Sequence, residues 1–177
     1  KANYYYQNIE NYIAVQNVGY VWWFVNTPGT SVIKGLELEA LYDAGFAFAN
    51  VSYTHAESNL PPTQNGLGVA SYLPDNVFAL TAGARFLERR LTVGGRVNYV
   101  GNTDAGQGFF GSTVADWDAY TLVDAFANYK FDNGLDLSLN VTNIFDKAYT
   151  PALSTLSSWT GDTGRGRTVL LTAKMQF

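Results

Sequence analysis

The chain has 177 residues and a formal net charge of −4; hydrophobic residues make up 47% of it and charged residues only 15%. The acidic balance argues against binding to a phosphate backbone, which needs clustered Lys and Arg side chains. No cysteine is present, so the chain forms neither a disulfide framework nor a thiolate metal site. The charged fraction lies well below the roughly 25% of a typical soluble domain, which favours a membrane protein.

Apolar and polar residues are interleaved along the whole chain rather than collected in long runs. Mean hydropathy is −0.07, and no segment reaches the roughly 18 consecutive apolar residues that a transmembrane helix needs. Such interleaving is typical of a transmembrane β-barrel, in which each strand has one row of side chains toward lipid and one toward the lumen. Composition therefore favours a membrane β-barrel over a soluble β-sandwich.

Alternation with a period of two residues defines about eight strands along the chain. The predicted strands are residues 2–13, 32–42, 46–57, 77–87, 91–101, 120–131, 135–142 and 165–177. The clearest is 135–142, in which leucine and valine alternate with polar residues. Polar and apolar residues do not alternate regularly in the tyrosine-rich segment 2–13, so its two faces stay unassigned. Residues 15–30 contain Gly19 and Pro28, and we predict a loop there.

Two further features refine these strands. Gly94 and Gly95 interrupt the strand at 91–101, where they relieve curvature or let a neighbouring aromatic ring pack over the backbone. The last strand alternates from Val169 and ends on Phe177. A terminal aromatic ring suits the edge of the apolar band of a membrane barrel.

Short and long connections alternate strictly between the predicted strands. The short turns are residues 43–45, 88–90 and 132–134, and the long loops are 16–31, 58–74, 102–118 and 146–164. In an antiparallel meander all long loops then emerge at one end and all short turns at the other, as in outer-membrane barrels. The sequence thus predicts an all-β fold, an antiparallel transmembrane β-barrel meander of about eight strands.

Three motifs carry a family resemblance. The segment Leu139-Asn-Val-Thr-Asn-Ile-Phe-Asp-Lys-Ala-Tyr149 resembles the stretch that precedes the last strand of TonB-dependent outer-membrane receptors. Residues 164–177 are similar to their terminal strand, and residues 34–40 are similar to a strand that recurs upstream in them. The resemblance covers most of the chain and places it in the outer membrane of a bacterial cell.

The resemblance implies a 22-stranded barrel with an N-terminal plug folded inside it. Residues 1–177 are then the C-terminal portion of that barrel, without the plug or the TonB box. The implied activity is active import of an iron chelate, haem or a ferric siderophore, without covalent cofactor and without enzymatic chemistry. The implied partners are outer-membrane lipid, the plug, the TonB energy-coupling complex, the barrel-assembly machinery, and the iron chelate or a haem carrier, with no nucleic acid.

Candidate site residues follow from this expectation and from strand parity. Four loop aromatics are placed to stack on a flat or apolar ligand: Phe109, Phe110, Trp117 and Trp159. Eight charged residues are expected to face the lumen and the plug: Glu37, Glu39, Arg85, Arg96, Asp124, Lys130, Asp136 and Lys174. Phe177 resembles the terminal aromatic signal that the assembly machinery recognises. We expect no catalytic residue and no metal site.

His55 is the single histidine of the chain. Haem iron commonly takes a histidine ligand, but His55 shares a strand face with Val51 and Tyr53 and is expected to point outward. Two alternatives from other classes stay open. One is a complete eight-stranded barrel that serves as a membrane anchor or adhesin. The other is a surface hydrolase that uses His55, although no serine triad motif accompanies it.

Overall fold

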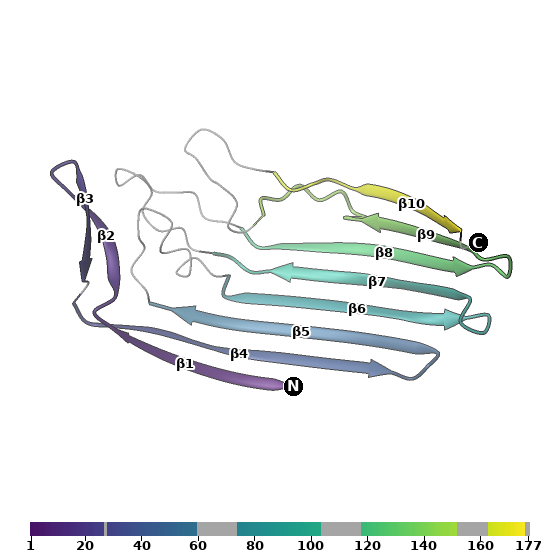
Figure 1. Cartoon of the computed structure of the whole chain (residues 1–177), viewed down its shortest axis with the longest axis horizontal. Helices are drawn as coiled ribbons and strands as arrows, with labels where there is room; N and C mark the ends of the chain where they lie inside the picture. Colours follow the sequence, from purple (N-terminus) through teal and green to yellow (C-terminus); the bar gives the residue numbers. More distant parts are fainter. Residues whose placement is uncertain (27, 60–73, 104–117, 152–162, 176–177) are drawn as a thin grey trace.

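The computed structural model describes residues 1–26, 28–59, 74–103, 118–151 and 163–175, and within them it contains β-strands and no helix (Figure 1). The strands are β1 (Ala2–Glu10), β2 (Ile13–Val18), β3 (Val21–Asn26), β4 (Thr30–Asp43), β5 (Ala47–Ser58), β6 (Asn76–Phe86), β7 (Leu91–Val100), β8 (Tyr120–Lys130), β9 (Leu135–Thr142) and β10 (Thr168–Met175). In the part of the chain that is described, no helix has the length and hydrophobicity needed to cross a membrane.

One antiparallel sheet of 8 strands carries most of the structure, in the order β1-β4-β5-β6-β7-β8-β9-β10. Strands β2 and β3, which follow β1 and precede β4 in the sequence, form a separate two-stranded hairpin, while β1 pairs directly with β4. Every neighbouring pair in the large sheet is antiparallel. The predicted all-β meander is therefore confirmed.

Cross-strand pairing sorts the side chains of the sheet by polarity. Leu139 of β9 lies opposite Leu171 of β10, whereas Ser138 lies opposite Thr172. Because successive residues of a strand point to opposite faces, one face collects the apolar row and the other collects the polar row. We call the face that carries Ser138 the polar face and the face that carries Leu139 the apolar face.

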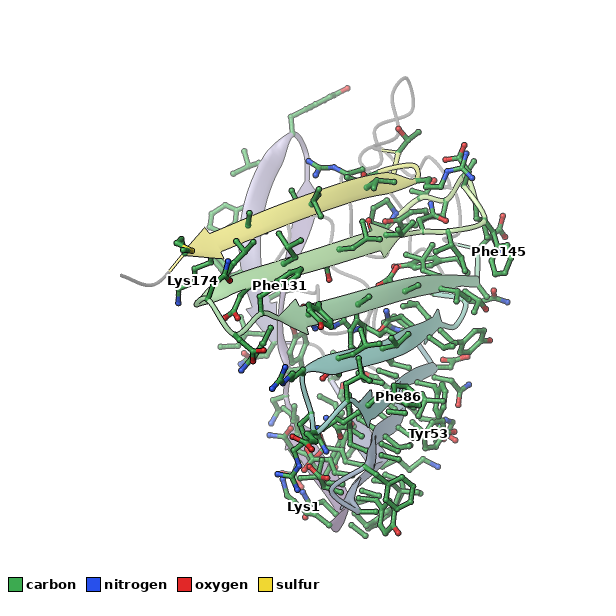
Figure 2. All side chains as sticks on the ribbon, turned by 90° about the vertical axis from the view of Figure 1, so that its right-hand side faces the viewer. Lys1, Tyr53, Phe86, Phe131, Phe145 and Lys174 are labelled. Atoms are coloured by element: carbon green, nitrogen blue, oxygen red, sulfur yellow. The ribbon has the colours of Figure 1, made fainter. Side chains whose placement is uncertain are left out.

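Neither face of the sheet is covered by a second layer of described residues, and side chains project from both faces (Figure 2). On the apolar face, Val169 is 63% exposed and Leu171 is 68% exposed. Ala56 is the one buried hydrophobic residue among the described positions. A continuous exposed apolar surface of this kind requires an apolar environment. The sheet is thus built as a wall with two unlike sides, not as the shell of a central core.

The short turns lie at one end of the sheet and the β2–β3 hairpin lies at the other (Figure 1). The predicted turn at 132–134 is confirmed: Gly134 has a φ of 82°, and the side-chain oxygen of Asn133 accepts a hydrogen bond from the Leu135 amide at 3.2 Å. Glycine takes this left-handed conformation without a steric penalty. These turns fix the register of the strands that they join.

The predicted loop at 15–30 is wrong over most of its length. β2 and β3 pair from Ile13 opposite Asn26 to Val18 opposite Val21. The reversal is a two-residue turn at Gly19 and Tyr20, with φ values of 62° and 68°. Two consecutive positive φ values match the twist of a β-hairpin. The register of β1 also settles which face each of its tyrosines lies on. Tyr5 lies opposite Gly35 on the polar face, and Tyr4 lies opposite Leu36 on the apolar face.

Candidate functional site

The eight charged residues expected to face the lumen all lie on the polar face. Asp136 pairs with both Lys130 and Lys174, and Arg96 pairs with Asp124. Strand parity and register place the remaining three, Glu37, Glu39 and Arg85, on the same face. Their expected contact with a plug stays a prediction.

Arg85 makes the best-defined ion pair of the polar face. Its two terminal nitrogens donate to the two carboxylate oxygens of Asp43 at 2.7 and 2.9 Å, and one of them also donates to the Gly45 carbonyl at 3.1 Å. The guanidinium carbon lies 4.7 Å from the centre of the Phe48 ring. A bidentate carboxylate on one side and an aromatic face on the other fix the arginine in one position.

Arg96 is held more loosely. Among the described residues, its polar contacts are the Asp124 carboxylate at 3.6 Å and the Thr81 hydroxyl at 3.4 Å. Its side chain is 47% exposed, whereas that of Asp124 is 14% exposed. Asp124 in turn accepts a hydrogen bond from the Asn143 amide at 2.9 Å. The carboxylate is thus fixed, whereas the described residues make only these two longer contacts with the guanidinium.

Two phenyl rings lie over two glycines in the same region. Phe48 is directly opposite Gly83, Gly83 is opposite Gly94, and Gly94 is opposite Phe126. A β-carbon added to Gly83 would lie 2.7 Å from the Phe48 ring, and one added to Gly94 would collide with the Phe126 ring. We call these four residues the phenyl strip. Of the two roles that the sequence left open for Gly94 and Gly95, relief of curvature or packing of an aromatic ring, the structure shows ring packing at Gly94, and the ring is that of Phe126.

Asn143 ties the segment after β9 to the start of β10. It is 3% exposed, and its side chain accepts from the Lys147 amide at 2.9 Å and donates to the carbonyls of Lys147 at 2.9 Å and Arg165 at 3.3 Å. Nearby, the Asp146 carboxylate accepts from the Arg167 amide at 2.7 Å. The motif that carries the family resemblance therefore serves to position the entry of the last strand.

His55 lies on the apolar face, as parity predicted, near the end opposite the short turns. Its ring contacts the Glu57 carboxylate at 3.1 Å and the Asn76 side-chain oxygen at 3.0 Å. Glu57 also pairs with Lys34 at 2.7 Å. A shallow open depression of about 360 Å³ adjoins this group, lined by Tyr6, Val32, Lys34, Glu57, Ser58 and Asn59. Among the described residues no three His, Asp or Glu side chains gather as metal ligands.

Several predicted positions cannot be placed. The four loop aromatics, Phe109, Phe110, Trp117 and Trp159, and the terminal Phe177 lie outside the described residues. Their expected roles stay predictions. Phe48, Phe126 and Asn143 were not among the predicted site residues. Gly94 and Gly95 indicated in the sequence that an aromatic ring could pack over the backbone. No local sequence pattern indicates the contact between Asn143 and Arg165.

The sequence matches, over residues 1–144, the family described as TonB dependent receptor-like, beta-barrel. It is 28% identical, over 97% of its length, to the TonB-dependent heme receptor A of Haemophilus ducreyi. It is 32% identical, over 64% of its length, to the catecholate siderophore receptor Fiu of Escherichia coli strain K12. The matched regions cover 24% and 15% of those two proteins, so the chain spans a quarter or less of their length.

A solved structure of such a receptor is also similar to this chain in fold. The crystal structure of the ferric-catecholate import receptor Fiu from Escherichia coli K12 superimposes on this chain with a TM-score of 0.77 and 26% identity. That match covers 99% of this chain and 25% of the other. Similarity in sequence and in structure thus extends over nearly all of the residues 1–177.

Proposed function

The chain belongs to the family of TonB-dependent receptor-like β-barrels, and from that membership we propose that it forms part of the wall of an outer-membrane importer of an iron chelate. The observation that carries the ligand class is the pair of sequence matches to a heme receptor and to a catecholate siderophore receptor. Both relatives are receptors, so the chain groups with proteins that take up ligands rather than transform them. The cargo is haem or a ferric siderophore.

The two unlike faces support a position in the outer membrane. The apolar face, with Leu139 and Leu171 in one row, suits contact with lipid hydrocarbon. The polar face, with Arg96 opposite Asp124, suits a wetted interior. The end that carries the β2–β3 hairpin is then extracellular and the short turns are periplasmic, because long connections of such barrels face outward.

We place residues 1–177 in the C-terminal portion of a 22-stranded barrel. In support, β1 and β10 are the outer strands of the sheet, and the described residues of neither strand pair with a further strand. Unpaired backbone groups in lipid are costly, so membrane sheets close on themselves. Further strands of the whole protein would satisfy these two edges, which favours the large barrel over a closed barrel of these strands alone.

The partners of the whole protein follow from the family. They are its own plug domain inside the barrel, the TonB energy-coupling complex at the periplasmic side, and the iron chelate at the extracellular side. Outer-membrane lipid surrounds the wall, and the barrel-assembly machinery inserts it. Transport involves no covalent step, and the energy comes from the proton gradient through TonB. The polar face then meets the plug through its mixed charges, which suits a plug that must rearrange.

The test is import by the full-length receptor in an Escherichia coli strain that lacks its own haem and catecholate receptors. Iron-limited cells are supplied with haemin or with the ferric complex of 2,3-dihydroxybenzoate, and iron uptake is measured. We expect uptake of at least one probe, and we expect it to disappear in an otherwise identical strain without TonB. Uptake of neither probe, or uptake that persists without TonB, would reject the proposed function.

A further inference from the structure

We infer that the phenyl strip is a contact site on the barrel wall for a planar, anionic aromatic ligand in transit, with Arg96 as its cationic partner. This inference rests on the proposed import function and adds a place on the wall where the cargo binds. The strip lies on the polar face, within the parts of β5 to β8 that are near the short turns, whereas the β2–β3 hairpin lies at the other end of the sheet (Figure 1).

The register makes the strip continuous. Phe48, Gly83, Gly94 and Phe126 form one cross-strand row over β5, β6, β7 and β8. The two inner positions have no side chain of their own, and the rings from the two outer positions lie over them. The row therefore presents ring surfaces close to the backbone instead of projecting side chains. Such a flat aromatic surface is suited to stacking against another flat ring.

The strip lies toward the short-turn end of the sheet. Asp43, the last residue of β4, is in the same row as Phe48, and the hairpin between β8 and β9 begins shortly after Phe126. In the orientation proposed above this end is periplasmic. A ligand at the strip has therefore passed most of the wall, so the site belongs to transit rather than to first capture outside the cell.

The charges next to the strip divide into a fixed cation and an available one. Arg85 follows Gly83 by two positions and is held by both oxygens of Asp43, so it orients the Phe48 ring. Arg96 follows Gly94 by two positions on the other side of the strip. Its contacts of 3.4 and 3.6 Å are long for a guanidinium. Within the described part of the chain, its donors are thus free to turn toward an anionic group that lies on the rings.

Beyond Arg85, the row next to the strip on the turn side is neutral and hydrogen-bonding. From Arg85 the register continues through Thr92, Asn128, Ser138 and Thr172. Hydroxyl and amide groups accept and donate hydrogen bonds without holding a charged ligand tightly. Aromatic faces, one available guanidinium and a neutral polar border together match a planar aromatic anion. Haem, with its carboxylates, and a ferric catecholate, with its ring-bound oxygens, share this chemistry.

The experiment uses the full-length receptor with Phe48→Leu, Phe126→Leu or Arg96→Gln. Leucine keeps an apolar side chain over the glycine but removes the aromatic face. The matched control is Phe86→Leu, a phenylalanine 52% exposed near the end of β6 on the apolar face. For each variant, membrane level, equilibrium binding to intact cells and initial uptake are measured with haemin and, separately, with the ferric complex of 2,3-dihydroxybenzoate.

We expect the ring variants to bind the imported probe at the cell surface as the wild type does, while initial uptake falls by roughly three- to tenfold per ring. Arg96→Gln should lower uptake in the same way, and Phe86→Leu should not. A loss confined to one probe would identify whether haem or the catecholate uses the strip. Uptake in the strip variants equal to that of Phe86→Leu would overturn the inference.

A different occupant would give a different pattern. If the strip seats the plug instead of the cargo, the variants would let vancomycin enter through a disturbed barrel and sensitise the cells, which would also overturn the inference. Failure of the inference stays separate from failure of the proposed function. In the first case the wild type imports a probe and the variants import it equally well, whereas in the second the wild type imports neither.

Discussion

Phe48 lies across Gly83 on the neighbouring strand, so that a β-carbon added to Gly83 would fall 2.7 Å from the phenyl ring and 2.8 Å from the Val93 carbonyl. The same relationship joins Phe126 to Gly94 and Tyr5 to Gly35, and each of these pairs is directly opposite in register. A ring that covers the bare backbone of a glycine stabilises the strand locally. Glycine is therefore required at these three positions, because any larger side chain would overlap with the ring on the neighbouring strand.

Gly83→Ala should destabilise the folded barrel by about 1–3 kcal/mol, because the added methyl group overlaps with the Phe48 ring and forces it to move. Urea unfolding of the refolded full-length receptor in detergent measures the change. The control is Gly95→Ala on the apolar face, where, among the described residues, the added carbon meets only the Asp124 carbonyl, at 3.2 Å. Equal stabilities of the two variants would show that the ring does not depend on the glycine.

Asp43 and Arg85 should stabilise the barrel jointly. In a double-mutant cycle with Asp43→Ala and Arg85→Ala, the loss in the double variant should be smaller than the sum of the two single losses, because each single change already removes the bidentate pair. The same unfolding measurement gives the coupling. A cycle between Asp43 and Arg90, which pairs with Asp132 instead, is the control. Strict additivity for Asp43 and Arg85 would contradict the prediction.

Asn143→Ala should cost about 1–3 kcal/mol of stability, because it removes three part-buried hydrogen bonds to the backbone of Lys147 and Arg165. Asn143→Asp retains the acceptor for the Lys147 amide but loses both donor contacts, so it should not restore the loss. Asn128→Ala, at a half-buried position of the polar face, serves as the control. The prediction fails if Asn143→Ala unfolds at the same urea concentration as Asn128→Ala.

The two faces of β9 should respond oppositely to charge. Leu139→Arg places a guanidinium on the apolar face and should reduce stability in a bilayer by about 2–4 kcal/mol if it lies near the midplane. Ser138→Arg, one residue away, points to the polar face and should be tolerated. Folding into lipid vesicles, followed by denaturant titration, compares the two variants. Equal penalties would mean that the face opposite Leu139 is not the wetted one.

The proposed orientation makes the two ends of the sheet differ in access from outside the cell. Because the chain has no cysteine, single cysteines in this part of the receptor report cleanly. Tyr20→Cys, at a turn residue that is 94% exposed, should react with an impermeant maleimide on intact cells. Asn133→Cys should react only after the outer membrane is permeabilised. The reverse pattern would invert the wall and reject the proposed extracellular end.

The strands with strict alternation could be predicted because the polarity of each residue indicates the face of the sheet on which it lies. In β9 the alternation of leucine with polar residues agrees with the observed pairing of Leu139 with Leu171. The β2–β3 hairpin was missed because both of its faces carry apolar residues, as Trp23 and Phe24 show, and because Pro28 and Gly29 suggested irregular structure. Where polarity does not separate the faces, periodicity carries no signal.

The site depends on contacts that span the sequence, which explains why less of it could be predicted. The eight charged residues were placed on one face by parity alone, and the register agrees. Strand parity alone indicated no role for Phe48 and Phe126. Their positions over Gly83 and Gly94 become visible only when the register of four neighbouring strands is known. Asn143 reaches Arg165, 22 positions along the chain, by a path that no local pattern encodes.

The composition of the β2–β3 hairpin has a consequence for contacts at the end of the sheet that we propose to be extracellular. Between Glu10 and Lys34 the chain carries no formally charged residue. Attraction between charges weakens within about 8 Å at physiological ionic strength and within about 3 Å at 1 M salt, but burial of apolar surface does not depend on such screening. A contact made by the apolar side chains of this hairpin should therefore not weaken as the ionic strength rises.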